Sequence, residues 1–329
     1  MTTRRKLLSA LGAISVVMPV ASFAQQPTKK VARVGYLSAV TAAVDAPRLD
    51  AFRQRLRELG YIDGQNIVFD YRHADANSGL LPGLAEELVR LKVDIVVAVA
   101  TSAAVAAKKA SRTVPIVFLG VFDPVAAGLV DNLARPTGNI TGFSNMISEL
   151  SAKRLELLKE SVPKLSRIAV MWEPHIVSSA QQWKESELAA KKLGLQIHSM
   201  QISGPNQYES AFKEAAAAHS AALAVTLTPT FLSDQKQIAD LAIKHRWPSI
   251  YAYESSVDAG GFMSYGPNPI DSYRSAAVNV DKILKGAKPA DLPIQQPTEF
   301  ELVVNLKTAQ QIGVKVPQPV LSRANKLIN

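Results

Sequence analysis

The chain has 329 residues, of which 47% are hydrophobic and 20% charged, and a formal charge of +9 at neutral pH. This balance is typical of a folded globular protein and excludes a disordered tail or a membrane-embedded bundle, while the scattered basic residues argue against nucleic-acid binding. Cysteine is absent, which excludes disulfides, so burial of apolar side chains must hold the fold together.

Residues 1–24 have the three parts of an export signal. A basic segment at residues 4–6 precedes an uncharged run, interrupted by Pro19, that ends in small residues at Ala24. The run is too short and too broken to stay as a membrane anchor, because a span needs about 20 predominantly apolar residues. We therefore expect cleavage near Ala24 and a mature protein in the periplasm. The paired arginines suit both the Sec and the twin-arginine (Tat) pathway, so the route stays open.

The next part of the chain alternates short β-rich runs with amphipathic helices, which is typical of a parallel sheet covered on both faces. Strands are predicted at residues 31–37, 67–71, 94–100, 115–119 and 139–143, and helices at 81–91 and 101–110. Another helix is predicted from apolar residues spaced three and four apart at Leu49, Phe52, Leu56 and Leu59. Gly60 is placed to end it.

A second cycle of the same kind follows. After a helix at 150–162, strands are predicted at 167–172, 196–201, 222–227, 249–253 and 261–264. The chain closes with a helix at 273–285, a proline-rich stretch, a strand at 301–305 and a helix from Lys307. The simplest arrangement of these last elements is that the chain crosses back between two lobes, adding the helix to the first lobe and the final segment to the second.

We therefore predict an α/β fold of two doubly wound parallel-sheet lobes joined by a hinge that the chain crosses several times. Lobe 1 is expected to take residues 31–144 plus 268–296. Lobe 2 is expected to take residues 145–267 plus 297–329.

In an open α/β sheet, ligands bind outside the carboxyl ends of the strands, so these ends supply the candidate site residues. In lobe 1, Thr101 and Ser102 begin a helix whose free N–H groups and hydroxyls suit a carboxylate, or Ser102 only caps that helix. Asp123, in a loop fixed by Pro124, is placed to hold a ligand ammonium or to cap the next turn. Ser38 follows the first strand, in a loop of small residues.

Lobe 2 offers polar and aromatic residues at the corresponding positions. They are Glu173, Thr228, Pro229, Tyr251, Glu254 and Tyr265. Carboxylates and rings at one sheet edge suit an organic ligand with an amine and an aromatic group. Core packing is the alternative role for Tyr251.

Motifs for catalysis are missing from the sequence. The 5 histidines have no metal-ligand spacing. The chain has no Gly-x-Ser-x-Gly elbow, and its first predicted strand is not followed by a glycine-rich phosphate turn. We therefore expect no catalytic residues, no metal and no cofactor.

Several segments carry a likeness to a known family. The most specific are residues 292–297 and 300–309, and further matches lie at 52–61, 64–67, 123–130 and 138–142. In these segments the chain resembles the ABC transporter substrate-binding proteins of the periplasmic-binding-protein type I fold, a family with tryptophan- and tyrosine-type solute-binding components. Members commonly have Asn where this chain has Glu173.

The resemblance implies a monomeric receptor that captures a small organic solute between its lobes, with amino-acid-like or aromatic acids favoured. It also implies delivery to an ABC permease in the inner membrane, a carboxylate site at Thr101 and Ser102, and an ammonium partner at Asp123. Two alternatives stay open. One is an exported hydrolase that uses the carboxylates of Asp123, Glu173 and Glu254, and the other is a ligand-sensing protein without transport.

Overall fold

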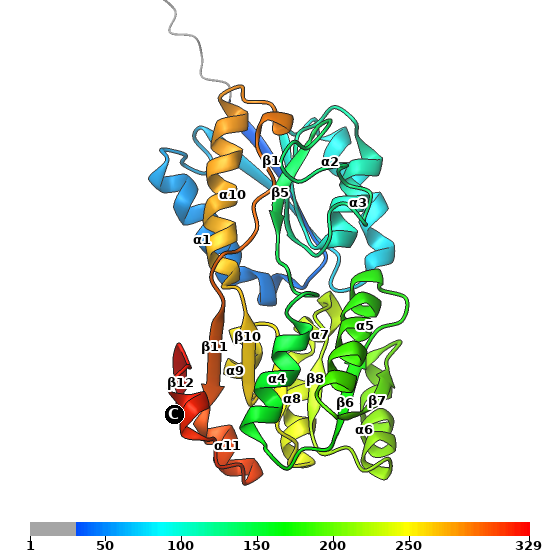
Figure 1. The fold of residues 1–329 in the computed structure, drawn as a ribbon. Helices are drawn as coiled ribbons and strands as arrows, with labels where there is room; N and C mark the ends of the chain where they lie inside the picture. Colours follow the sequence, from blue (N-terminus) through cyan, green and yellow to red (C-terminus); the bar gives the residue numbers. More distant parts are fainter. Residues whose placement is uncertain (1–30) are drawn as a thin grey trace, which may run out of the picture. The chain divides into compact units, whose positions relative to one another are not determined.

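The computed structural model describes residues 31–329, so the predicted export signal at 1–24 lies outside the described residues. The described residues form two α/β lobes, each built around one sheet (Figure 1). This confirms the predicted fold class. None of the described helices combines the length and the apolar character that a membrane span requires.

The first lobe contains a five-stranded sheet in the order β2-β1-β3-β4-β5, and all its strand pairs are parallel. Its strands are β1 (Ala32–Ser38), β2 (Ile67–His73), β3 (Ile95–Val99), β4 (Ile116–Val121) and β5 (Ile140–Ser144). The central strand β3 is buried along its whole Ile-Val-Val-Ala-Val run, as expected of a strand covered on both faces. The strand order reverses between β1 and β3, which opens a crevice at their carboxyl ends.

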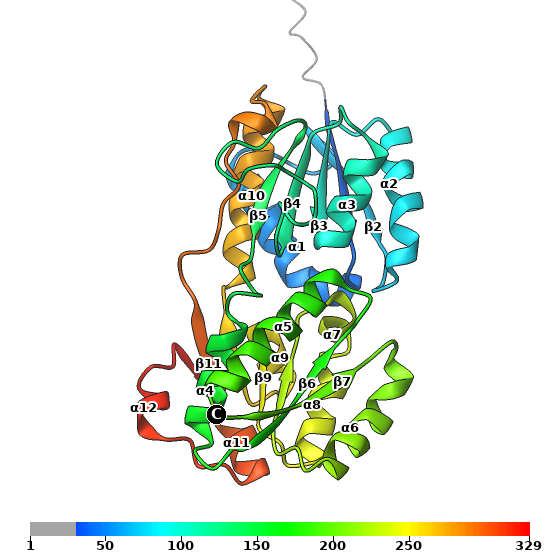
Figure 2. The same ribbon diagram turned by 45° about the vertical axis from the view of Figure 1, so that its right-hand side comes forward.

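Helices cover both faces of this sheet. They are α1 (Ala42–Glu58), α2 (Leu81–Arg90), α3 (Thr101–Ala110) and α10 (Pro269–Leu284), with a 3-10 turn η1 (Ser78–Leu80) before α2. One apolar cluster joins the sheet to α1 and α10, which lie side by side in both views, and another joins it to α2 and α3 (Figures 1 and 2). Helix α10 follows the strands of the second lobe in sequence, so the chain has crossed back to reach it.

The second lobe contains a seven-stranded sheet in the order β12-β11-β10-β9-β8-β6-β7. Its strands are β6 (Arg167–Trp172), β7 (Gln196–Gln201), β8 (Leu223–Val225), β9 (Ser249–Tyr251), β10 (Met263–Gly266), β11 (Glu301–Asn305) and β12 (Lys326–Ile328). The pairing of β10 with β11 is antiparallel, so this sheet is not wholly parallel as predicted. The chain returns from the first lobe at the edge of this sheet where the parallel strands end. Strand β11 therefore starts at that edge and runs in the opposite direction to β10.

The helices of the second lobe also lie on both faces of its sheet. They are α4 (Ser151–Ser161), α5 (Val177–Lys192), α6 (Tyr208–Ala217), α7 (Pro229–Ser233), α8 (Gln235–Lys244), α9 (Glu254–Asp258), α11 (Leu306–Ile312) and α12 (Gln318–Leu321), with a 3-10 turn η2 (Pro205–Gln207). The 3-10 turn η3 (Pro289–Asp291) follows α10 and lies beside β5 of the first lobe.

The chain passes between the lobes three times, after β5, after β10 and before β11. The last crossing starts beside β5, where the backbone N–H of Gln295 donates to the carbonyl of Gly142 at 3.0 Å. A small apolar cluster also spans the lobes, with Val40 and Phe122 on one side and Leu232 and Tyr253 on the other. The lobes are therefore in contact at their facing edges, and the lobe boundaries drawn from the sequence stay a prediction.

Candidate functional site

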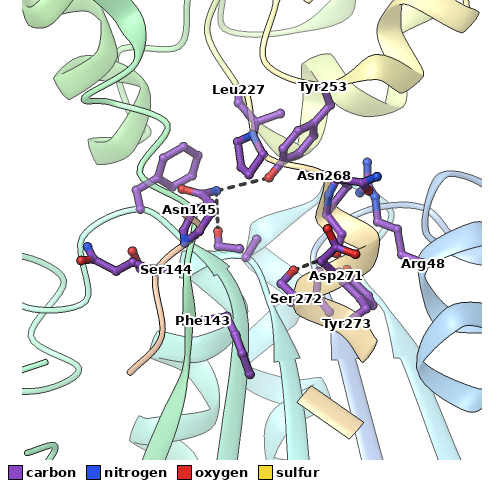
Figure 3. A pocket seen from close by; sticks show the side chains of 18 of the residues that line it. Arg48, Phe143, Ser144, Asn145, Leu227, Tyr253, Asn268, Asp271, Ser272 and Tyr273 are labelled. Atoms are coloured by element: carbon purple, nitrogen blue, oxygen red, sulfur yellow. Dashed lines mark hydrogen bonds between the residues drawn. The ribbon is translucent and has the colours of Figure 1, made fainter. Parts of the chain in front are cut away.

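A cavity of about 260 Å³ lies between the lobes, beside the three crossings (Figure 3). Its walls are largely apolar and come from both lobes. The apolar side chains include Val40, Val99, Phe122, Phe143, Leu227 and Leu232. The volume of this cavity is slightly below the range of about 300–1,000 Å³ that is typical of small-molecule pockets, so the cavity suits one small organic molecule and not an oligomer.

Asn145, in the first crossing, joins the two lobes across the cavity. Its Nδ2 donates to the carbonyl of Gly120 in the first lobe and to the hydroxyl of Tyr253 in the second, each at 3.4 Å (Figure 3). Asn145 is only 6% exposed. Hydrogen bonds of this length are weak, so they favour the contact between the lobes without locking it.

Arg48 is the only cationic side chain among the residues that line this cavity. It reaches the cavity from α1, opposite Asn145 (Figure 3), and its guanidinium carbon lies 5.3 Å from the ring centre of Tyr253. Stacking of this kind stabilises a partly desolvated cation. Arg48 is 6% exposed, and among the described residues its guanidinium makes no hydrogen bond and has no carboxylate within 4.0 Å.

A buried carboxylate one helical turn earlier balances this charge. Asp45 is fully buried and accepts hydrogen bonds from the hydroxyls of Tyr36 at 2.9 Å and Tyr273 at 3.0 Å. Burial alone would raise the pKa of Asp45, but the nearby imidazole of His73 and the charge of Arg48 outweigh it and lower the pKa below its usual value. Asp45 therefore stays ionised, and its negative charge stabilises the positive charge of Arg48.

A smaller cavity of about 60 Å³ lies at the start of α3. Thr101 and Ser102 both line it, together with His175 and Ser178 of the second lobe. Ser102 is not the cap of α3, because the capping position is Ala100 and no side chain caps there. Ala100 has a φ of 77° and a ψ of 159°, a conformation that is costly for any residue but glycine and is often kept at functional sites.

The structure brings four of the predicted site residues to the two cavities. Thr228 lines the larger one and caps α7 by accepting a hydrogen bond from the N–H of Phe231, and Pro229 lines both. Thr101 and Ser102 line the smaller one. These four therefore keep a position suited to ligand contact, and their ligand role stays a prediction.

Asp123 lies outside the lining of either cavity. Its Oδ1 accepts hydrogen bonds from the N–H groups of Val125 and Ala126, each at 3.0 Å, which is the capping alternative weighed from the sequence. Pro124, beside it, is buried, and its carbonyl accepts from Leu129. The ammonium-binding role of Asp123 stays a prediction.

Glu173 also lies outside the two linings, at the carboxyl end of β6. Its side chain is 3% exposed, and Oε2 has no hydrogen-bond partner among the described residues. The imidazole of His175, which lines the smaller cavity, lies 3.7 Å from Oε1. A buried carboxylate with a free oxygen beside the cleft keeps Glu173 a candidate partner for a ligand amine.

The side chains of the other predicted site residues are buried or make contacts within the protein. Ser38 is fully buried and accepts from the N–H of Val40 at 3.3 Å. Tyr251 is 3% exposed within the apolar core, Tyr265 packs on Phe300, and Glu254 pairs with Lys326. None of the carboxylates of Asp123, Glu173 and Glu254 lines the larger cavity. Among residues 31–329 no group of three or more His, Asp and Glu side chains is placed to hold a metal ion.

Sequence reasoning missed two residues that line the larger cavity, Arg48 and Asn145. A signal for Arg48 was present in α1. The buried residues of this helix are Asp45, Arg48, Phe52 and Leu56, so two charged residues continue the apolar stripe at the same spacing of three and four. A charge on the apolar face of a helix indicates a paired or functional group.

The comparisons with known proteins agree with this arrangement. The family model described as "ABC transporter substrate binding protein" matches residues 38–328. The chain belongs to this family. This substrate-binding protein is 29% identical to a tyrosine-binding protein of Clostridioides difficile, over 84% of its own length and 80% of the relative. The resemblance inferred from the sequence is thereby confirmed.

Two solved structures are similar over almost the whole of this substrate-binding protein. An ABC domain from Streptococcus pneumonia in complex with L-Trp is 26% identical, with a TM-score of 0.83 over 90% of this chain and 99% of that one. A ligand-free, open substrate-binding protein from Clostridium difficile is also 26% identical, with a TM-score of 0.67 over 91% and 100%. The TM-score is higher for the L-Trp complex than for the ligand-free, open structure, which agrees with the apolar contact between the two lobes of this chain.

Proposed function

We propose that this protein is a periplasmic receptor that captures a small amino-acid-like solute with an aromatic side chain and delivers it to an ABC permease in the inner membrane. It acts as a monomer. The observation that carries the proposal is the cavity between the lobes, which combines apolar and aromatic walls with one buried guanidinium. Apolar walls with a few convergent polar groups are typical of sites for small organic ligands.

The relatives support an aromatic amino acid as the solute. One is named for tyrosine binding and another was solved with L-Trp, and both match this chain over most of its length. The cavity offers such a ligand the rings of Phe122, Phe143 and Tyr253. Aromatic pairs contribute about 0.5–1.5 kcal/mol beyond the burial of their area, which favours a ring over an aliphatic chain of the same size.

We expect L-tyrosine, L-tryptophan or L-phenylalanine to stabilise the purified mature protein against heat. A ligand present at about 100 times its dissociation constant adds about 2.7 kcal/mol to the free energy of unfolding. The measurement is a thermal-shift titration, with D-glucose and L-lysine as ligands that the apolar cavity should reject. A shift with either of these, and none with the aromatic amino acids, would contradict the proposed solute class.

We propose further that residues 1–24 direct export and are then removed. The native producer should release, on osmotic shock, a protein whose measured mass corresponds to a chain that begins at Gln25. Light scattering of this protein should give the mass of one chain. Replacing Arg4 and Arg5 together by lysine should stop export if the twin-arginine pathway is used and leave it unchanged if the Sec pathway is used. Full-length protein that stays in the cytoplasm would contradict the proposal.

A further inference from the structure

We propose that Arg48 is the residue that holds the carboxylate of the solute, so that the cavity between the lobes selects organic carboxylates. The inference rests on the proposed function, because it names the group by which that same cavity recognises its solute. It differs from the arrangement implied by the family resemblance, which places the carboxylate at Thr101 and Ser102. The two arrangements predict different effects of substitution.

The first argument is that Arg48 is buried without a hydrogen-bond partner. The second lobe provides a comparison in Arg154 of α4, which is 4% exposed and donates to the carbonyls of Ile147 and Tyr265 and to the hydroxyl of Ser151. Arg48 is 6% exposed and makes no hydrogen bond within residues 31–329. Because Arg48 lines the cavity, the five N–H donors of its guanidinium are available to an acceptor that enters the cavity.

The second argument is that the surroundings keep Arg48 in place at the cavity wall. The ring of Tyr253 lies under the guanidinium, and the ionised carboxylate of Asp45 attracts it from within the lobe. Asp45 itself is fixed by the hydroxyls of Tyr36 and Tyr273, and Tyr273 also lines the cavity. The positive charge is therefore oriented before any ligand arrives, which lowers the entropic cost of binding.

The third argument is chemical complementarity. A guanidinium presents a planar fork of donors that matches the two oxygens of a carboxylate. No other cationic side chain lines this cavity. The remaining lining includes the carboxylates of Asp271 and Glu299 as well as apolar side chains such as Phe122, Phe143 and Leu227. A solute with a carboxylate at one end and a ring at the other satisfies both parts of the cavity. Thr101 and Ser102 line the smaller cavity of about 60 Å³ instead, which is too small for the whole of such a molecule.

The test measures the affinity of four variants for L-tyrosine and for tyramine, which is the same molecule without the carboxylate, by calorimetry on the mature protein. Arg48→Met removes the charge and keeps a long apolar side chain. Arg48→Lys keeps the positive charge but removes the planar pair of N–H donors. If Arg48→Met fails to fold, Arg48→Lys alone tests whether Arg48 binds the carboxylate. Arg57→Met is the matched control, because Arg57 lies on the same helix α1 and is exposed. Asp123→Asn tests the ammonium contact that the arrangement implied by the resemblance assigns to Asp123.

We expect Arg48→Met to weaken L-tyrosine binding about tenfold to a hundredfold, which is the range for a lost charge-assisted hydrogen bond, and to leave tyramine binding unchanged. Arg48→Lys should give an intermediate loss, and Arg57→Met and Asp123→Asn should bind as the wild type does. L-Tyrosine binding that survives both Arg48 substitutions, or that Asp123→Asn weakens tenfold while Arg48→Met does not, overturns the inference and leaves the proposed function standing. A wild-type protein that binds neither L-tyrosine nor any other aromatic acid overturns both.

Discussion

Asp45→Ala should destabilise the protein by about 3–5 kcal/mol, the usual cost of removing one partner from a buried ionic network. The substitution leaves the hydroxyls of Tyr36 and Tyr273 without their acceptor and the charge of Arg48 without its counter-charge. Asp45 and Tyr36 are fully buried, so the loss of the carboxylate leaves the Tyr36 hydroxyl without a partner inside the lobe. The free energy of unfolding, measured in urea, checks this result. A loss below about 1 kcal/mol would show that Asp45 does not organise this side of the site.

Asp45→Asn separates the charge from the hydrogen bonds. The pKa of Asp45 is lowered in the folded protein, so its charge contributes stability above the unfolded-state pKa of about 3.9, and this contribution is lost as the pH falls below it. As the pH falls below about 4, the wild type should therefore lose a part of its stability that Asp45→Asn does not lose. Equal acid dependence of the two proteins would contradict the lowered pKa.

Tyr253→Ala should weaken solute binding about 30-fold or more, because truncating a buried aromatic residue that seals a binding site costs about 2 kcal/mol or more. Tyr253 is 7% exposed, lines the cavity, and belongs to one apolar cluster with Leu232 of its own lobe and Phe122 of the other. Its ring also lies under Arg48, so the substitution removes a wall and a support of the guanidinium together. Calorimetric titration with L-tyrosine or L-tryptophan measures the loss.

Two further substitutions act as controls for this prediction. Tyr253→Phe keeps the ring and removes only a hydroxyl bonded weakly to Asn145 at 3.4 Å, so binding should change by about threefold or less. Tyr251→Ala makes the same truncation two residues earlier, in the core and outside both cavities. It should lower stability and leave the affinity of the folded protein unchanged. A large affinity loss in Tyr251→Ala would instead support the ligand role predicted for Tyr251 from the sequence.

The alternation of apolar runs and helical periodicity was sufficient to predict both lobes. These signals are local, and α3 was predicted over 101–110, the bounds it has. The reversed direction of β11 was not predictable from its sequence, because Glu301–Asn305 would look the same in either direction. Its direction depends on which edge of the sheet the chain enters, and that is set by the third crossing between the lobes.

The site was less predictable than the fold, for a physical reason. The strand-end rule selected Thr228 and Pro229, which line the larger cavity, but it does not consider helix interiors and crossings, which supply Arg48 and Asn145. It also treats a carboxylate such as that of Asp123 as free, although the loop's own N–H groups bind it. Which polar groups the fold consumes and which it leaves for a ligand is decided by tertiary packing.

A crystal structure of the mature protein with L-tyrosine tests the central claim most directly. The account predicts the ligand in the cavity between the lobes, with its carboxylate about 2.7–2.9 Å from the guanidinium nitrogens of Arg48 and its ring between Phe122 and Tyr253. A ligand whose carboxylate lies at the start of α3, with Arg48 still unpaired, would contradict it.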